Sequence, residues 1–215
     1  MLYQLTDTGK SRSFPTSHAL LEKAEAAGDV VVIVGEKVGA ALQTLTDRES
    51  KVAVLIELGT EPLAVHTGER RATEGSNLVG FSRFRLGSAE PSALVELVRQ
   101  PRTDERAIAA AKEIFEAAGL QVAICGDFDG RILERLVRPY YNAALRRLDE
   151  GLASADDLDT TLRLGLGYPE GPIALLERTG LEHHYDVTQA LFEALGDPAY
   201  APARRARVAK QRSKG

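Results

Sequence analysis

The sequence predicts an α/β domain followed by an all-α domain. Up to about residue 127, short runs of β-branched residues alternate with amphipathic helical stretches, which is typical of a layered α/β architecture. From residue 128 onward, apolar residues recur at three- and four-residue spacings and strand patterns are almost absent. We therefore predict domains at residues 1–127 and 128–200, followed by a basic tail at residues 201–215.

The elements of the first domain follow from apolar runs and from the residues that interrupt them. The run Val30–Val34 is typical of a strand buried on both faces of a parallel sheet. Thr103 is a suitable N-cap for a helix, and Gly119 ends that helix. We expect helices over residues 17–27, 36–45 and 103–118, and strands over residues 30–34, 51–58, 62–66, 77–84, 93–99 and 121–125.

Glycine, proline and serine set the helix boundaries in the second domain. A broad apolar stripe predicts a helix over residues 133–148, with Pro139 inside it and Gly151 at its end. Ser154, followed by two acids, predicts the start of the next helix. After a dense turn over residues 165–172, a last helical stretch is interrupted at Gly180 and ends at Leu195.

The composition is that of an ordinary soluble globular protein. The chain has 215 residues, of which 44% are hydrophobic and 27% charged, and its net charge is −4 at pH 7. Its aliphatic runs are far shorter than the roughly 18 residues that a membrane span needs. The first residues also lack the pattern of a signal peptide. We therefore expect a cytoplasmic protein with no membrane partner.

Residues 201–215 are basic, whereas the rest of the chain has an excess of acids. The segment has no aromatic residue on which a base could stack, and the acidic body would repel phosphate. We therefore expect a solvated tail and no nucleic-acid partner.

The turn after the first buried strand is where a dinucleotide site would lie, because a helix N-terminus there offers N–H groups to a pyrophosphate. The known fingerprint has three glycines, and the second lets the backbone approach the phosphates. Here the second position is Lys37, preceded by the acid Glu36. Glu57 is only a loose candidate for the acid that would bind the ribose. We therefore expect no dinucleotide site.

Histidine and cysteine give few candidates for chemistry. The four histidines show no metal-ligand spacing, so we expect no metal site, and we place His183 and His184 on a helix surface. His66 follows a predicted strand and is a candidate general base, the alternative being a partly exposed histidine without a role. Cys125, the single cysteine, is interpreted as a buried small apolar side chain.

Three segments of the second domain resemble the C-terminal domain of the 3-hydroxyacyl-CoA dehydrogenase family. They are residues 135–145, 150–159 and 164–176, the last of which contains the turn Leu-Gly-Leu-Gly-Tyr-Pro-Glu-Gly-Pro. The resemblance implies that this domain forms a dimer interface and one wall of an acyl-CoA cleft.

The first domain resembles a shortened NAD domain of the same family. Residues 63–67, 79–84, 93–98 and 103–118 fall in register with the later part of that domain, while the fingerprint loop is missing. The resemblance implies a reduced Rossmann-like parallel sheet, similar to the second half of long 3-hydroxybutyryl-CoA dehydrogenases.

The family transfers a hydride to NAD while a histidine, oriented by a glutamate, removes the hydroxyl proton. By the resemblance, Ser82 stands where that histidine is expected and Glu96 keeps the place of the glutamate. The substrate-contacting serine falls near Gly68, and Glu134 replaces an asparagine that meets the substrate. A serine hydroxyl is not basic near neutral pH, so Ser82 cannot replace the imidazole. The catalytic candidates are therefore Glu96 and His66.

These observations favour a homodimer that is related to 3-hydroxyacyl-CoA dehydrogenases, is associated with acyl-CoA, and has lost its NAD site and catalytic histidine. Such a protein binds an acyl-CoA ligand or an active dehydrogenase partner, and we expect no cofactor of its own. An active NAD-dependent 3-hydroxybutyryl-CoA dehydrogenase using His66 is one alternative. A structural dimerisation module is another.

Overall fold

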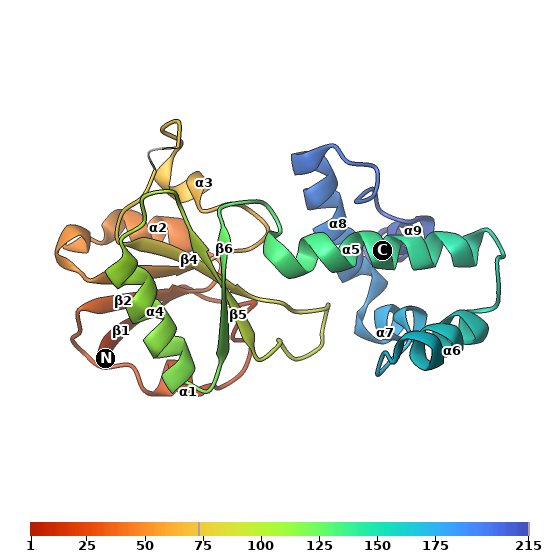
Figure 1. The fold of residues 1–215 in the computed structure, drawn as a ribbon, viewed down its shortest axis with the longest axis horizontal. Helices are drawn as coiled ribbons and strands as arrows, with labels where there is room; N and C mark the ends of the chain where they lie inside the picture. The colour runs from red at the N-terminus through yellow and green to blue at the C-terminus, as the bar shows by residue number, and fades with distance from the viewer. Residues whose placement is uncertain (73, 215) are drawn as a thin grey trace. The chain divides into compact units, whose positions relative to one another are not determined.

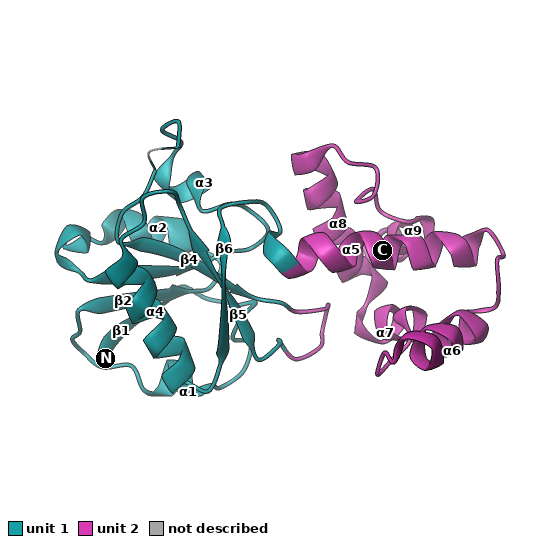
Figure 2. Cartoon of the chain, in the orientation of Figure 1, with its two compact units in different colours: residues 1–84, 91–132 teal, residues 85–90, 133–215 magenta. Residues whose placement is uncertain are grey.

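The computed structural model describes residues 1–72 and 74–214. Within them the chain forms two compact units, which Figure 2 shows in different colours. The first unit comprises residues 1–84 and 91–132, and the second comprises residues 85–90 and the described chain from residue 133 onward. The first is an α/β unit and the second is all-α, so the predicted fold class is confirmed.

A six-stranded sheet forms the centre of the first unit (Figure 1). Its neighbouring strands run parallel except β4 and β5, which pair antiparallel, so the sheet is Rossmann-like in being mostly parallel. The strands are β1 (Tyr3–Asp7), β2 (Val30–Val34), β3 (Ala53–Glu57), β4 (Leu78–Arg83), β5 (Leu94–Arg99) and β6 (Gln121–Gly126).

The strands with the clearest sequence pattern lie inside the sheet. Every residue of β2 and β3 is buried, as expected for apolar runs in a parallel sheet that is covered on both faces. Strand β1 was not predicted. It is an edge strand with the sequence YQLTD, and of its residues only Tyr3 is fully buried. An edge strand of this kind lacks the apolar run that marks a central one.

Helices cover both faces of the sheet (Figure 1). On one face, Leu20 and Phe115 from α1 and α4 pack with alternate side chains of the strands. On the other face, Leu42 of α2 and Leu63 at the start of α3 do the same. The helices are α1 (Ala19–Glu22), α2 (Val38–Thr44), α3 (Ala64–Thr67) and α4 (Glu105–Ala117), with a 3-10 turn η1 (Arg48–Ser50).

The prediction of a strand over residues 62–66 is wrong, because α3 occupies this place. The Asp127 carboxylate accepts hydrogen bonds from the backbone N–H groups of Leu63 and Ala64, at 2.5 and 2.9 Å, and so caps the first turn. Pro62 has no N–H to satisfy and suits the start of a helix. Since the capping carboxylate lies far along the chain, a local sequence pattern does not reveal this helix.

The order of the strands in the sheet is their order along the chain, from β1 to β6. In doubly wound dinucleotide-binding sheets the strand order reverses at one point, and the ligand lies in the crevice that this reversal creates. The described sheet has no reversal. Its topology therefore provides no crevice of this kind.

The second unit is built from helices whose ends match the expected capping residues. Ser154 Oγ accepts from the Asp157 N–H at 3.1 Å and begins α6, which ends at the left-handed Gly167. Gly180 separates the next two helices. The helices are α5 (Arg131–Asp149), whose first residues belong to the first unit, α6 (Ala155–Leu166), α7 (Pro172–Thr179), α8 (Leu181–Leu195) and α9 (Arg204–Arg212). No helix in the described chain is both long enough and apolar enough to cross a membrane.

The prediction of a solvated tail over residues 201–215 is wrong for residues 204–212, which form α9 and contact α8. Ala206 is buried in this helix. Lys210 Nζ lies 2.7 Å from an Asp186 carboxylate oxygen, and Arg205 Nε lies 2.8 Å from Asp149 Oδ1. Lys210 and Arg205 thus pair with acids of the same unit, which are not apparent from the composition of the segment alone.

Candidate functional site

Two N–H groups in the turn between β2 and α2 are already bound by side chains of the protein. The Gly35 N–H donates to Glu57 Oε2 at 2.7 Å, and the Lys37 N–H donates to Thr8 Oγ1 at 3.1 Å. Glu57, at the end of β3, also accepts from the Ser13 N–H at 2.7 Å and is 5% exposed. This carboxylate joins three backbone segments, so it is not available to bind a ribose.

Close packing also fills the space beside this turn. Gly35 has a φ of +102°, and a Cβ added to it would lie 2.7 Å from Thr8 Oγ1 and 2.9 Å from the Gly9 backbone nitrogen. The loop after β1 therefore lies where a pyrophosphate would need room. Glu36 also brings a carboxylate beside Gly9, which disfavours an anion. The residues of this turn do not fit NAD.

We expect Glu57→Ala to lower the free energy of unfolding by about 2–4 kcal/mol, because two buried N–H groups lose their acceptor. Urea unfolding followed by circular dichroism measures the change. Glu49→Ala removes an exposed acid and serves as the matched control. A Glu57→Ala protein as stable as this control would contradict the structural role of Glu57.

Strands β4 and β5 place Ser82 directly opposite Glu96. Both side chains are buried, at 5% and 1% exposure. Glu96 Oε1 accepts a hydrogen bond from the Ile132 N–H at 2.9 Å, at the start of α5. The structure therefore brings together the two positions at which the resemblance places a base and its orienting carboxylate. At the first of them it holds a hydroxyl, which does not act as a general base near neutral pH.

His66 lies in α3 and has Glu61 as its neighbouring acid. The His66 side chain is 13% exposed, and its Nε2 lies 3.8 Å from Glu61 Oε1. Burial opposes ionisation of Glu61, but the adjacent imidazole, the Gly59 N–H and the charge of Arg131 lower its pKa to about 2. His66 also lines a polar cavity of about 410 Å³. An ionised carboxylate beside an imidazole is the arrangement that orients a histidine base.

Glu134 is buried and paired within its own helix. Its side chain is 4% exposed, and it forms an ion pair with Arg138 one turn later, whose side chain is fully buried. Arg138 Nε and Nη2 donate to the two oxygens of the carboxylate. The negative charge of Glu134 is therefore balanced inside the helical unit.

The same arginine connects two buried residues that sequence analysis did not select. Arg138 Nη1 donates to His184 Nδ1 at 2.9 Å, so the neutral imidazole carries its proton on Nε2, which lies 3.0 Å from Asn142 Oδ1. His184 is 1% exposed, and the prediction that it lies on a helix surface is wrong. Burial, together with the charge of Arg138, lowers the pKa of His184 to about 3. Glu134 and Arg138 are four residues apart, the spacing at which oppositely charged side chains pair on a helix. This spacing is the sequence signal that could have revealed the ion pair.

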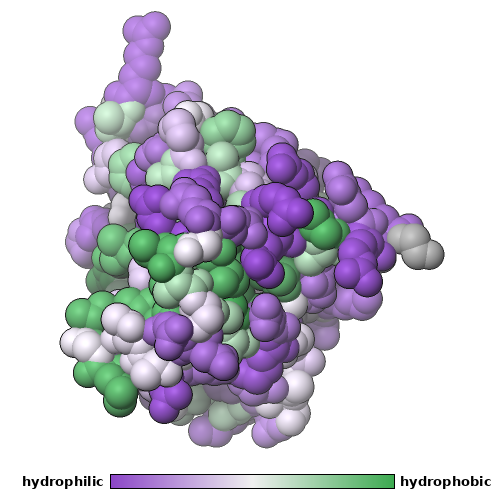
Figure 3. Space-filling view, turned by 90° about the vertical axis from the view of Figure 1, so that its right-hand side faces the viewer, coloured by the Kyte–Doolittle hydropathy of each residue, from purple (hydrophilic) through white to green (hydrophobic). Residues whose placement is uncertain are grey.

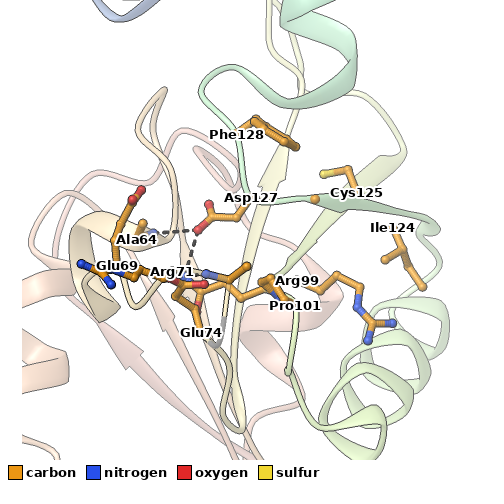
Figure 4. A pocket seen from close by; sticks show the side chains of 13 residues that line it. Ala64, Glu69, Arg71, Glu74, Arg99, Pro101, Ile124, Cys125, Asp127 and Phe128 are labelled. Atoms are coloured by element: carbon orange, nitrogen blue, oxygen red, sulfur yellow. Dashed lines mark hydrogen bonds between the residues drawn. The ribbon is translucent and has the colours of Figure 1, made fainter.

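A cavity of about 560 Å³ lies at the ends of β5 and β6 (Figure 4). Its Asp127 carboxylate is bound by the Ala64 N–H and by Gln100 Nε2, each at 2.9 Å. Burial, with a contribution from the charge of Glu96, raises the pKa of the Cys125 thiol to about 11, so this sulfur is a poor nucleophile. Glu96, His66 and Ser82 are not among the residues that line it.

Within residues 1–72 and 74–214, the structure places no three His, Cys, Asp or Glu side chains where they could hold a metal ion. The histidines in particular lie on separate elements or bind other partners. His18 caps α1, where its Nδ1 accepts from the Leu20 N–H at 3.1 Å.

Comparison with known proteins identifies the helical half. Residues 130–214 match the profile of a family described as 3-hydroxyacyl-CoA dehydrogenase, C-terminal domain. This half of the chain is therefore similar to the C-terminal domain of 3-hydroxyacyl-CoA dehydrogenases. A 3-hydroxybutyryl-CoA dehydrogenase of Bradyrhizobium diazoefficiens is 37% identical over 109 residues, which are 51% of this chain and 37% of that protein. The mitochondrial hydroxyacyl-coenzyme A dehydrogenase of Homo sapiens is 38% identical over 89 residues, 41% of this chain and 28% of its own.

Solved structures of the 3-hydroxyacyl-CoA dehydrogenase fold resemble more of the chain. M. tuberculosis FadB2 superposes with a TM-score of 0.70 at 24% identity, covering 87% of this chain and 67% of its own. The (S)-3-hydroxybutyryl-CoA dehydrogenase PaaH1 from Ralstonia eutropha gives a TM-score of 0.67 at 24% identity, covering 90% of this chain and 67% of its own. The family fold therefore extends to the first unit. The sequence matches, in contrast, span little more than a third of the curated relatives' length.

Proposed function

We propose that this member of the 3-hydroxyacyl-CoA dehydrogenase family is a homodimer that associates with acyl-CoA and does not itself transfer a hydride to NAD. The observation that carries the proposal is the turn between β2 and α2. There, Glu57 and Thr8 accept the hydrogen bonds of two backbone N–H groups, those of Gly35 and Lys37, that would otherwise face a pyrophosphate. The sequential strand order supports the same conclusion, because it provides no crevice for a dinucleotide.

The second part of the proposal concerns the missing base. Hydride transfer from an alcohol requires a group that removes the hydroxyl proton. Ser82 faces Glu96 at the place where the family has an imidazole, and a serine hydroxyl does not accept this proton. The chain therefore retains the carboxylate position without the base that it would orient.

His66 supports one alternative, an active NAD-dependent 3-hydroxybutyryl-CoA dehydrogenase. Its imidazole has an ionised carboxylate beside it and lines a polar cavity. In that case His66 would serve as the general base. Turnover of 3-hydroxybutyryl-CoA by the purified protein, lost in His66→Ala and kept in His18→Ala, would establish this alternative and overturn the proposal.

We expect no saturable binding of NADH at micromolar concentration, measured by enhancement of its fluorescence. We also expect acetoacetyl-CoA to raise the melting temperature. A ligand that binds only the folded state, at about 100 times its Kd, stabilises a protein by about 2.7 kcal/mol. Saturable NADH binding would contradict the first half of the proposal. An unchanged melting temperature at saturating acetoacetyl-CoA would contradict the second half.

The dimer is proposed to form through apolar side chains that the helical unit leaves exposed. No residue of α6 is fully buried, although the helix is amphipathic, and Leu164 and Leu166 are 79% and 64% exposed. Leu136 of α5 and Leu152 after it are 68% and 66% exposed. Figure 3 shows areas of apolar surface among hydrophilic ones on one face of the molecule. Exposed apolar surface of this kind marks an interaction site.

We expect the protein to sediment as a dimer at micromolar concentration. Leu164→Glu combined with Leu166→Glu should raise the dissociation constant by roughly 100-fold, because the buried centre of an interface excludes unpaired charge. Ala117→Glu, which adds a charge at an exposed position of α4 in the first unit, is the control and should leave the dimer intact. A wild-type protein that sediments as a monomer would overturn this part of the proposal.

A further inference from the structure

The helical unit contains a small cavity to which the proposed function assigns no role. It has a volume of about 230 Å³ and lies among α5, the turn before α7, and α7. Most of its lining is apolar or aromatic and includes Val137, Tyr140, Tyr141, Tyr168, Pro172 and Leu175.

Three tyrosine rings give this cavity its chemical character. The ring of Tyr140 lies 5.3 Å from that of Tyr141 and 5.8 Å from that of Tyr168, and the ring planes are tilted by 50° and 58°. Aromatic pairs are favoured at such distances and tilts beyond the area they bury. A further aromatic ring entering the cavity would therefore meet ring edges and faces already in place.

The hydroxyl of Tyr140 is a buried donor without a partner. Among the described residues its oxygen has no hydrogen-bond partner. Burial, with smaller contributions from Tyr168, Tyr141 and Asp159, raises the pKa of this hydroxyl to about 12, so its proton stays in place. Leaving a buried donor unsatisfied costs free energy, and a ligand with an acceptor oxygen would recover it.

The wall formed by the turn before α7 is fixed. The Asp159 carboxylate accepts from the Ile173 and Ala174 N–H groups, each at 2.9 Å, and lies so close to Gly171 that a Cβ there would meet it at 2.1 Å. Glu170, at the rim, is paired with Arg178 through contacts of 3.0 and 2.7 Å. The cavity is therefore preformed, and the charge at its rim is balanced.

We propose that this cavity binds a small aromatic compound whose ring carries a hydrogen-bond acceptor, such as an aryl ketone. An apolar cavity of about 150 Å³ holds benzene, so the volume here suits one ring with one short substituent. The ring would lie against the tyrosines, and the acceptor would take the Tyr140 hydroxyl proton in a hydrogen bond.

The test compares acetophenone with cyclohexyl methyl ketone, which has the same carbonyl and nearly the same size but no aromatic ring. Binding to the full chain is followed by NMR shifts of the backbone amides of residues 137–141 and 167–175. We expect acetophenone to shift these signals and to bind at least about fivefold more tightly than the cyclohexyl compound. Tyr140→Phe should weaken acetophenone about fivefold, whereas Tyr185→Phe, on α8 and outside the cavity, should not.

Leu175→Trp fills the cavity and should abolish the shifts. Equal binding of the two ketones, or binding unaffected by Tyr140→Phe, would overturn the proposal. So would the absence of binding by the wild type. If, in addition, Leu175→Trp converts a dimer to a monomer in sedimentation, a side chain of a second copy occupies the cavity instead. Because no CoA compound or NADH is used, this test can fail without affecting the proposed function, and the reverse also holds.

Discussion

Arg138→Met is expected to destabilise the helical unit by about 3–5 kcal/mol, because it removes the arginine that pairs with the buried carboxylate of Glu134. Both side chains are almost completely buried, so water cannot solvate the remaining charge. The same substitution removes the donor to His184 Nδ1. Urea unfolding followed by circular dichroism at the helical band measures the loss.

A double substitution distinguishes loss of pairing from loss of packing. In Glu134→Leu combined with Arg138→Met, both charges of the pair are removed, and apolar replacement of a buried ion pair is often neutral. We expect the double variant to be at least about 2 kcal/mol more stable than Arg138→Met alone. Arg147→Met, which removes an exposed helical arginine paired with Glu150, should change stability by less than about 1 kcal/mol. Equal losses in the single and double variants would show that the buried charge of Glu134 is not the cause.

The second large effect concerns pH. The folded protein holds His184 neutral with a pKa of about 3, whereas an unfolded histidine has a pKa of about 6.5. Between these values the unfolded state binds a proton that the folded state does not. The contribution of His184 is therefore complete above pH 6.5 and is lost as the pH falls toward 3, at up to about 1.4 kcal/mol per pH unit.

The measurement compares wild type with His184→Gln between pH 7 and 5, a range in which carboxylates stay ionised. Glutamine retains an acceptor for Arg138 and a donor for Asn142, so the variant is expected to fold. The stability advantage of the wild type over this variant should shrink by about 2 kcal/mol across the range. His183→Gln, at the neighbouring exposed histidine, should leave the pH dependence unchanged. A constant difference between wild type and His184→Gln would contradict the neutral, buried state of His184.

The fold could be predicted wherever local sequence was decisive. The apolar runs of β2 and β3 lie inside the sheet, and Ser154 begins a helix as its capping pattern requires. Prediction failed where the local structure depends on a residue that is distant in the sequence. Asp127 turns residues 64–67 into a helix, and Asp186 and Asp149 hold α9 on the helical unit. Such partners are not adjacent in the sequence, so the local sequence pattern does not indicate them.

For the candidate site, too, local sequence patterns were informative and partners distant in the sequence could not be predicted. From the glycine pattern of the β2–α2 turn we expect no dinucleotide site, but that pattern does not reveal that Glu57 accepts the hydrogen bond of the Gly35 N–H. The pairing of Ser82 with Glu96 follows from strand register, which the sequence suggests only through the resemblance. His184 was misplaced because a histidine pair on an amphipathic helix does not reveal which ring points inward.

The sequential strand order also bears on how the sheet assembles. Each strand pairs with the strand made just before it, so no early strand must wait for a partner synthesised much later. Because the entropy lost in closing a loop grows with its length, chains whose contacts are close in sequence fold faster. In a doubly wound sheet the first strand lies in the middle and has to acquire neighbours on both sides. Here the sheet can grow in one direction as the chain leaves the ribosome, because each new strand adds to the edge opposite β1.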